Sequence, residues 1–214
     1  MRVTLDDQPC QVPADSIRDA LAGAAAAAEA NGRIIVEVMV DGQAWSQDDL
    51  GSAERCDGVA GHLELISTDR DKLVCRTLSD VDAALLEIDG LQRAAAESLQ
   101  VGETAEGMGR LGEALELWLL VERGIGMSTE TAGVDLPSVI HDGEPVGRAI
   151  HRLKDQLRGI RDALAGHDHV SLADGLLYEL PDVIAYWRSI VGTVRALVES
   201  RDAGTTPDTP ETGA

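Results

Sequence analysis

The sequence predicts an α+β protein: a small N-terminal α/β unit followed by an antiparallel four-helix bundle. Short alternating and β-branched runs up to residue 68 are typical of strands. From about residue 70, apolar residues recur at the three- and four-residue spacing of amphipathic helices, which must pack together to be stable. We therefore expect an α/β unit over 1–68, a helical bundle over 70–201 and a disordered acidic tail over 202–214.

The first segment of the α/β unit reads as a strand pair followed by a helix. Apolar and polar residues alternate over 1–5 and again over 10–12, with a polar turn between them. Asp15 or Ser16 can cap a helix that ends at Asn31–Gly32. The apolar face of that helix is expected to hold Ile17, Leu21, Ala24 and Ala28.

Three further strands complete the unit. Residues 33–40 are rich in β-branched side chains and end at an Asp-Gly turn signal, and 43–45 and 62–67 supply two shorter strands. The resulting order of strands and helix resembles that of a β-grasp, or ubiquitin-like, unit. This resemblance implies a small sheet with one helix packed on it.

The first two helices of the bundle are separated by a stop at Gly102 and a restart at "ETAE" (103–106). The first is expected to bury Val74, Leu78, Val81, Leu85, Ile88, Ala95 and Leu99. The second is expected to bury Met108, Leu111, Leu115, Trp118 and Ile125. A polar stretch over 126–144 then forms the longest connection.

The last two helices begin near Pro145 and Asp168. The third carries Ile150, Leu153, Leu157, Ile160 and Leu164 on one face. The fourth carries Leu176, Leu180, Val183, Trp187, Ile190, Val194 and Leu197. Pro181 lies inside this pattern, lacks an N–H group and is expected to kink the fourth helix.

Composition argues against several classes of function. The net charge is −20, which disfavours binding to nucleic acids and to anionic membranes. No apolar run approaches the ~20 residues of a membrane span. The three cysteines leave one over in any disulfide scheme, which is typical of a reduced protein, so a cytoplasmic location is expected.

The catalytic and cofactor motifs that can be read from a single sequence give no assignment. "GMGRLG" (107–112) fits the glycine pattern of dinucleotide sites, but a helix end rather than a strand precedes it. We interpret these glycines as small residues that let two helices approach closely. No catalytic residue, metal ligand or cofactor is assigned from the sequence.

The triplet His167–Asp168–His169 has two interpretations. Two histidines flanking an acid can contribute to a metal site, although two ligands are too few for one. Alternatively, Asp168 caps the fourth helix by accepting hydrogen bonds from free backbone N–H groups, with the histidines in solvent. We favour the cap, and the stretch then marks the start of a packed helix.

An aromatic cluster on the fourth helix, flanked by basic residues on the third, predicts a protein-binding function. In this hypothesis a non-enzymatic adaptor holds an amphipathic helix of a client protein in a groove beside the fourth helix. The candidate contact residues are Tyr178, Tyr186 and Trp187, with Arg152 and Arg158 at the rim.

The helical region over about 80–190 resembles the flagellin export chaperone family. The matching residues are Ala163, Asp168, Leu172, Leu176, Leu177, Glu179, Leu180 and Trp187. Pro181 and the N-terminal unit depart from that family's pattern. The resemblance implies a cytoplasmic helical bundle that wraps an amphipathic segment of an aggregation-prone client.

Two other classes of function stay open at this point. In one, the protein is an enzyme or a binding protein that holds a metal or small molecule in the bundle interior through His151, His167, His169 and nearby acids. Alternatively, the chain is a self-assembling structural subunit or a homodimer.

Overall fold

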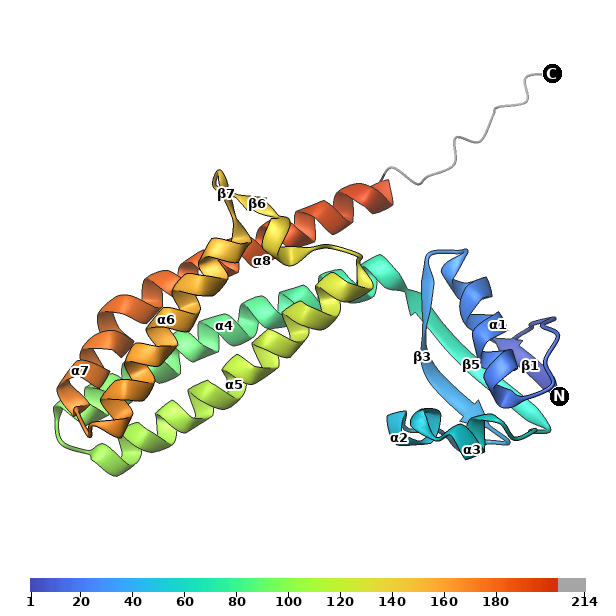
Figure 1. Cartoon of the computed structure of the whole chain (residues 1–214), viewed down its shortest axis with the longest axis horizontal. Coiled ribbons are helices and arrows are strands. Elements are labelled where there is room, and N and C mark those ends of the chain that lie inside the picture. Colours follow the sequence, from blue (N-terminus) through green and yellow to red (C-terminus); the bar gives the residue numbers. More distant parts are fainter. Residues whose placement is uncertain (204–214) are drawn as a thin grey trace, which may run out of the picture. The chain divides into compact units, whose positions relative to one another are not determined.

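A computed structural model describes residues 1–203 of the chain, and its fold is α+β (Figure 1). The chain divides into two compact units, Met1–Leu73 (unit 1) and a second that begins at Val74 (unit 2). Unit 1 holds a small mixed sheet and unit 2 holds long helices. The predicted tail falls outside the described residues, apart from 202 and 203, which end the last helix.

The sheet of unit 1 has five strands in the order β2-β1-β5-β3-β4. Their bounds are β1 Arg2–Leu5, β2 Gln8–Pro9, β3 Arg33–Val40, β4 Gln43–Ala44 and β5 His62–Asp69. The central strand β5 pairs in parallel with β1, and the other three pairs of neighbouring strands are antiparallel. Leu63 on β5 therefore lies between Val3 on β1 and Val40 on β3, forming a continuous apolar row.

An irregularity in β3 allows more of this strand to face the core. The pairing with β5 shifts register between Ile35 and Glu37, so Val36 is an extra residue. Ile35 and Val38 are three positions apart and would face opposite sides of a regular strand. With the extra residue, both pack in the same core cluster, while Val36 is 51% exposed.

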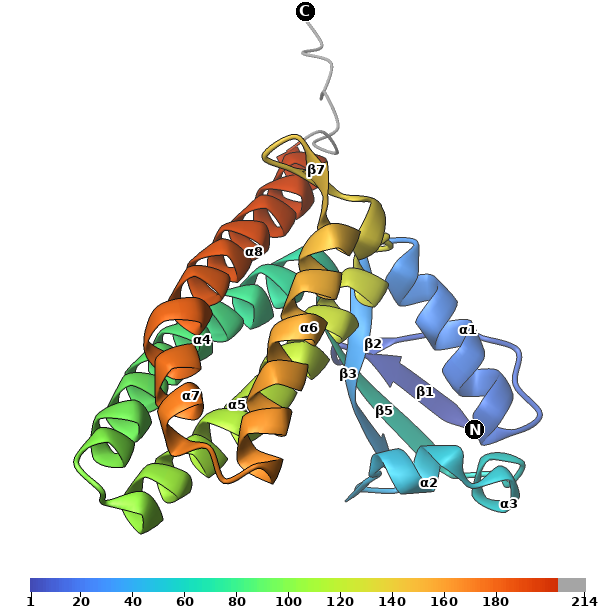
Figure 2. The same cartoon turned by 60° about the vertical axis from the view of Figure 1, so that its left-hand side comes forward.

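Helix α1 (Ile17–Glu29) covers one face of the sheet (Figure 2). Ser16 caps it by accepting a hydrogen bond from the Asp19 N–H at 3.1 Å, which confirms one of the two predicted caps. The buried positions of α1 include Ala20, whereas Leu21 is only half-buried. Ile17, Ala24 and Ala28 are buried as predicted, so the predicted face was wrong at Leu21 alone.

Two short helices, α2 (Gln47–Gly51) and α3 (Ala53–Cys56), occupy a stretch for which the sequence predicted no helix. Ser46 and Asp49 form a reciprocal capping box at the start of α2. Such short segments contain too few apolar residues to show a helical period. They connect β4 to β5 and border a hollow described below.

Unit 2 begins with a helical hairpin of α4 (Arg70–Gln100) and α5 (Thr104–Thr131) (Figure 1). Gly102 has a φ of 86°, which lets the chain turn back between the two helices. All seven apolar residues predicted for the face of the first helix are buried. The second helix extends to Thr131, further than predicted.

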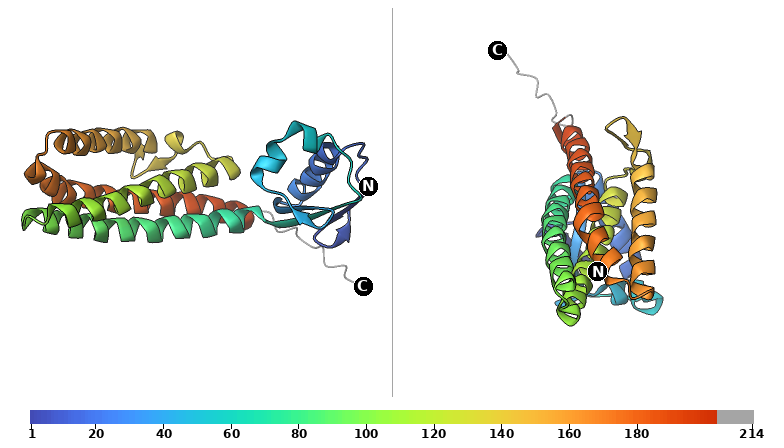
Figure 3. Two further views of the ribbon diagram at one scale, coloured as in Figure 1. Left: turned by 90° about the horizontal axis from the view of Figure 1, so that it is seen from below. Right: turned by 90° about the vertical axis from the view of Figure 1, so that its left-hand side faces the viewer.

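The connection after α5 contains a short 3-10 turn, η1 (Leu136–Ser138), and a two-stranded hairpin, β6 (Ile140–His141) and β7 (Glu144–Pro145). Helix α6 (Val146–Ala165) follows. The chain then runs back through α7 (His169–Asp174), the π-helical turn η2 (Gly175–Glu179) and α8 (Leu180–Ala203). The irregularity expected near Pro181 thus takes the form of a π-turn before it. Figure 3 shows these helices running lengthwise in its left panel.

The main core of unit 2 is formed by residues from α4, α5, α6 and α8. A second cluster, at the end of the unit near the α4–α5 turn, joins residues of α7 and η2 to α4, α5 and α6. Helix α5 contributes Leu111, Ala114, Val121 and Ile125, whereas Met108 and Leu115 are exposed. The predicted face of this helix was therefore wrong at these two positions. Leu197, predicted on the inner face of the last helix, is 40% exposed.

Candidate functional site

The structure brings three of the five predicted contact residues to one hollow between α6 and α8. Arg152 comes from α6, while Tyr186 and Trp187 come from α8. The hollow has a volume of about 290 Å³. Its other lining residues are Ala149, Leu153, Gln156, Asp182 and Val183.

A cation–π contact forms part of the wall of this α6–α8 hollow. The Arg152 Cζ lies 5.1 Å from the centre of the Tyr186 ring. An Arg152 Nη2 atom also lies 3.7 Å from Glu144 Oε2, in an ion pair with both side chains largely in solvent. Such an exposed pair is weak, so another carboxylate can replace Glu144 at low cost.

The floor of the hollow combines apolar surface with one unpartnered acceptor. Trp187 is 6% exposed and packs in the main core of unit 2. The Gln156 Oε1 atom is buried and accepts no hydrogen bond from residues 1–203. A buried amide oxygen without a donor is costly, so Gln156 is a position where the packing of α6 loses stability.

Tyr178 and Arg158 do not line this hollow. Tyr178 lies in η2 and is 71% exposed. Eight positions separate Tyr178 from Tyr186, which places the two side chains about 80° apart around a regular α-helix. Arg158 is exposed and pairs with Asp155 at 2.7 Å.

Sequence reasoning missed His141, which lies beside the hollow's aromatic wall. His141 is 6% exposed, and its Nδ1 lies 2.8 Å from Thr193 Oγ1. Its ring meets the Tyr186 ring edge-on, with centroids 5.2 Å apart. The Asp142–Gly143 turn signal could have predicted the hairpin that carries His141, because Asp-Gly is typical of tight hairpins.

The histidines considered as metal ligands lie on α6 (His151), just before α7 (His167) and at the first residue of α7 (His169). His151 Nδ1 lies 2.7 Å from the Gly147 carbonyl oxygen, one turn earlier on α6. His167 is exposed, with a φ of 53°. Within residues 1–203, no group of three or more His, Cys, Asp or Glu side chains is placed to hold a metal ion.

Asp168 caps the helix that follows it, as predicted. Its carboxylate accepts hydrogen bonds from the Ser171 N–H at 3.0 Å and the Ser171 hydroxyl at 2.7 Å. These hydrogen bonds, the backbone one first, lower the pKa of Asp168. The acid of the His-Asp-His triplet therefore serves the start of α7.

The glycines of "GMGRLG" lie within α5 rather than between a strand and a helix. A Cβ on Gly107 would lie 2.9 Å from the Ala95 carbonyl oxygen of α4. This confirms for Gly107 that a small residue permits close approach of the two helices. Gly109 and Gly112 face open space.

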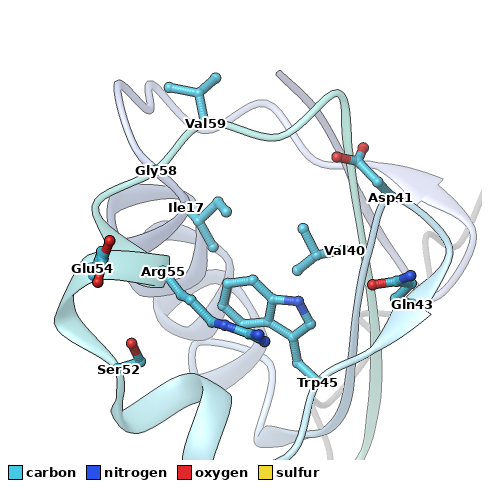
Figure 4. A pocket seen from close by; sticks show the side chains of 10 residues that line it. All are labelled: Ile17, Val40, Asp41, Gln43, Trp45, Ser52, Glu54, Arg55, Gly58 and Val59. Atoms are coloured by element: carbon cyan, nitrogen blue, oxygen red, sulfur yellow. The ribbon is translucent and has the colours of Figure 1, made fainter.

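Unit 1 has a second hollow, of about 610 Å³, bordered by α1, the β3–β4 hairpin and α3 (Figure 4). The side chains of Ile17, Val40 and Trp45 point toward its centre (Figure 4). The remaining lining residues are Asp41, Gln43, Ser52, Glu54, Arg55, Gly58 and Val59.

Two of the charged groups at this unit 1 hollow are used within the fold. Arg55 forms an ion pair with Asp49. Hydrogen bonds from Ser46, first from its backbone N–H, lower the pKa of Asp49 and keep it charged. Asp41 accepts a hydrogen bond from the His62 N–H at 2.7 Å. These groups therefore stabilise the loops around the hollow.

Comparison of the chain with protein-family models, with curated proteins and with solved structures gives no match. Within the described residues, no helix combines the length and apolar character needed to cross a membrane. The candidate sites therefore rest on the geometry of this chain alone.

Proposed function

We propose that this protein is a non-enzymatic adaptor or chaperone-like protein of the cytoplasm, which binds an amphipathic helix of a client in the α6–α8 hollow. The observation that carries this proposal is that Arg152, Tyr186 and Trp187 line a single hollow. The odd number of cysteines and the strongly acidic composition support the cytoplasmic location.

In this proposal, unit 2 is an antiparallel four-helix bundle and unit 1 is a β-grasp-like domain. The shared core of α4, α5, α6 and α8 supports the bundle. The strand order β2-β1-β5-β3-β4, with its parallel central pair and one covering helix, supports the β-grasp arrangement. The residues behind the resemblance to flagellin export chaperones include Leu172, Leu176 and Leu180, which are buried and so support the bundle rather than a client surface.

The size of the hollow suits a single anchoring side chain of a client. Its volume of about 290 Å³ is at the small end of typical ligand pockets, roughly 300–1,000 Å³. Val183 and Trp187 offer apolar contact to an aliphatic anchor. A helix that places one leucine into such a hollow can also present polar groups at its rim.

Polar groups at the hollow indicate the chemistry of the client. Arg152 can exchange its weak contact with Glu144 for a carboxylate of the client. The client helix is therefore amphipathic, with acidic residues beside its apolar face.

A designed leucine–glutamate helix of about five turns tests this proposal. Binding is followed by the fluorescence of Trp187 in a chain carrying W45F and W118F. We expect the peptide to shift that fluorescence, and we expect Arg152→Gln to weaken binding by about fivefold, roughly 1 kcal/mol. Arg152 is chosen because Trp187 also packs in the core and its substitution would alter stability.

Arg161→Gln is the matched control, because it removes the same charge from an exposed position on α6 outside the hollow. We expect this variant to bind as the parent does. Absence of peptide binding, or equal loss in both variants, would contradict the proposed site.

A further inference from the structure

The outward side of α5 carries an unusual number of exposed apolar side chains. Leu119 is 67% exposed, and Leu120 and Met127 are each 60% exposed. Met108 and Leu115 add two further residues, at 36% and 39% exposure. We call these five residues the α5 outer face.

The five residues form two neighbouring rows along the outer side of α5. Met108, Leu115 and Leu119 are spaced seven and four positions apart, so they share one side of the helix. Leu120 and Met127 form the second row, about a third of a turn around the helix, and Glu116 and Arg123 lie between the two rows. From Met108 to Met127 the surface extends about 28 Å, at 1.5 Å per residue.

A helix of a soluble protein ordinarily shows a polar side to solvent. Helix α5 carries exposed apolar residues among the charged residues of its outer side, while Leu111, Val121 and Ile125 fill the core on its inner side. Five large apolar residues exposed on one side of a helix indicate an interaction site. Exposed glycines at 109, 112 and 126, with open space around them, allow a partner backbone to approach closely.

The charges around the α5 outer face are mainly negative. Four exposed glutamates make no ion pair with any residue in 1–203, and they are Glu113, Glu116, Glu122 and Glu130. One exposed base, Arg123, lies on the same helix. Glu106 is already neutralised by Arg110. A partner is therefore favoured when it brings positive charge.

We propose that the α5 outer face docks a basic amphipathic helix of another protein. Apolar side chains of that helix cover Leu119, Leu120 and Met127, and its lysines or arginines approach the flanking glutamates. A second copy of this chain is disfavoured as the occupant, because each copy carries a net charge of −20 and would repel the other.

This surface differs from the α6–α8 hollow in both position and charge preference. None of the residues that line that hollow comes from α5. The hollow presents Arg152 to an acidic client, whereas the α5 outer face presents glutamates. The α5 outer face goes beyond the proposed function, and its test does not depend on the test of the hollow.

Binding of a labelled leucine–lysine helix of about five turns, measured by fluorescence anisotropy, tests the proposal. The full chain is expected to bind this peptide. The double variant L119Q/L120Q should weaken binding by about tenfold, because two apolar contacts are lost. The matched control L86Q/L197Q changes two exposed leucines on α4 and α8 and should stay within about twofold of the parent.

A second set of variants tests the contribution of charge. E113Q/E116Q/E130Q should weaken binding and reduce its dependence on salt, because fewer charges face the lysines. D174N/E179Q neutralises exposed acids on α7 and η2 and should have a smaller effect. Arg152→Gln should leave the leucine–lysine peptide bound, which separates this result from the test of the hollow.

Three outcomes would overturn the proposal. The first is no binding of the leucine–lysine peptide. The second is equal weakening by L119Q/L120Q and by L86Q/L197Q. The third is a concentration-dependent increase of mass in light scattering that L119Q/L120Q abolishes, because it would assign the α5 outer face to a second copy of the chain.

Discussion

The guanidinium of Arg188 on α8 donates two hydrogen bonds to the carboxylate of Asp82 on α4. The Nε–Oδ1 distance is 2.7 Å and the Nη2–Oδ2 distance is 3.1 Å. Two parallel bonds of this kind require a planar guanidinium, which lysine lacks. The hydrogen bond to Asp82 raises the pKa of Arg188 further above its ordinary value. The pair thus joins two helices that are far apart in the sequence.

Replacing Asp82 by asparagine should lower the free energy of unfolding of unit 2 by about 1 kcal/mol, because the pair is only partly shielded from solvent. Urea unfolding in a W45F background, followed by the fluorescence of Trp118 and Trp187, measures this change. Asp80→Asn removes an exposed acid from the same helix and should change stability little. Equal effects of the two variants would show that the ion pair adds no stability.

Truncation of two adjacent leucines of α4 should change stability by very different amounts. Leu85 is fully buried in the main core of unit 2, whereas Leu86 is 52% exposed. Leu85→Ala should cost about 2–5 kcal/mol through lost burial and a residual cavity. Leu86→Ala should stay within about 0.5 kcal/mol of the parent. The same urea titration compares them, and similar losses at both positions would place the core on a different face of α4.

The sequence was most informative where the structure depends on local periodicity. The seven residues predicted for the inner face of α4 are all buried, because regular spacing over many turns is a strong signal. The signal was ambiguous in α5, where apolar residues occur on both sides. Met108 and Leu115 were therefore assigned to the core, although they lie on the outer face.

The candidate site was predictable only in part, because it depends on contacts between distant segments. Arg152, Tyr186 and Trp187 could be predicted as contact residues because they are aromatic or basic side chains on neighbouring helices. Gln156 is a neutral residue in a helical pattern, and its importance comes from an acceptor left without a donor. His141 is separated from Thr193 by 52 positions, so only the folded chain reveals their contact.

The carboxylate of Asp6 holds the β1–β2 turn to the rest of the sheet. It accepts hydrogen bonds from the Ser67 hydroxyl at 2.6 Å and the Ser67 N–H at 2.7 Å, and it lies 3.3 Å from Arg33 Nη2. The bonds from Ser67, first from its hydroxyl, and the charge of Arg33 lower the pKa of Asp6. The charged form is therefore favoured in the folded state.

The stabilisation by Asp6 should be present in full above about pH 4, the ordinary pKa of an aspartate, and be lost as the pH falls through the lower value of the folded state. Asp6→Asn should cost unit 1 about 1 kcal/mol at pH 7, allowing for solvent screening of a partly exposed group. The difference from the parent should shrink below about pH 4. Unfolding followed by Trp45 fluorescence in a W118F/W187F background measures both effects.

Asp7→Asn is the control for this pH dependence, because Asp7 is exposed and adjacent to Asp6. Its φ of 61° is also acceptable to asparagine. A pH-independent difference between Asp6→Asn and the parent would show that the charge of Asp6 is not what stabilises the turn.

The glycines of "GMGRLG" should give opposite results when each is replaced by alanine. A Cβ at Gly107 would lie 2.9 Å from the Ala95 carbonyl oxygen and also 2.9 Å from Leu99 Cγ, so Gly107→Ala should destabilise unit 2 by about 1–3 kcal/mol through overpacking. A Cβ at Gly112 would instead point into open space, with no neighbouring side chain of residues 1–203 within 4 Å. Gly112→Ala should therefore stabilise the helix by about 0.5–1 kcal/mol. Thermal and urea unfolding of the two variants check the signs. If both variants instead kept the parent's stability, close contact of α5 with α4 would not explain the glycine at position 107.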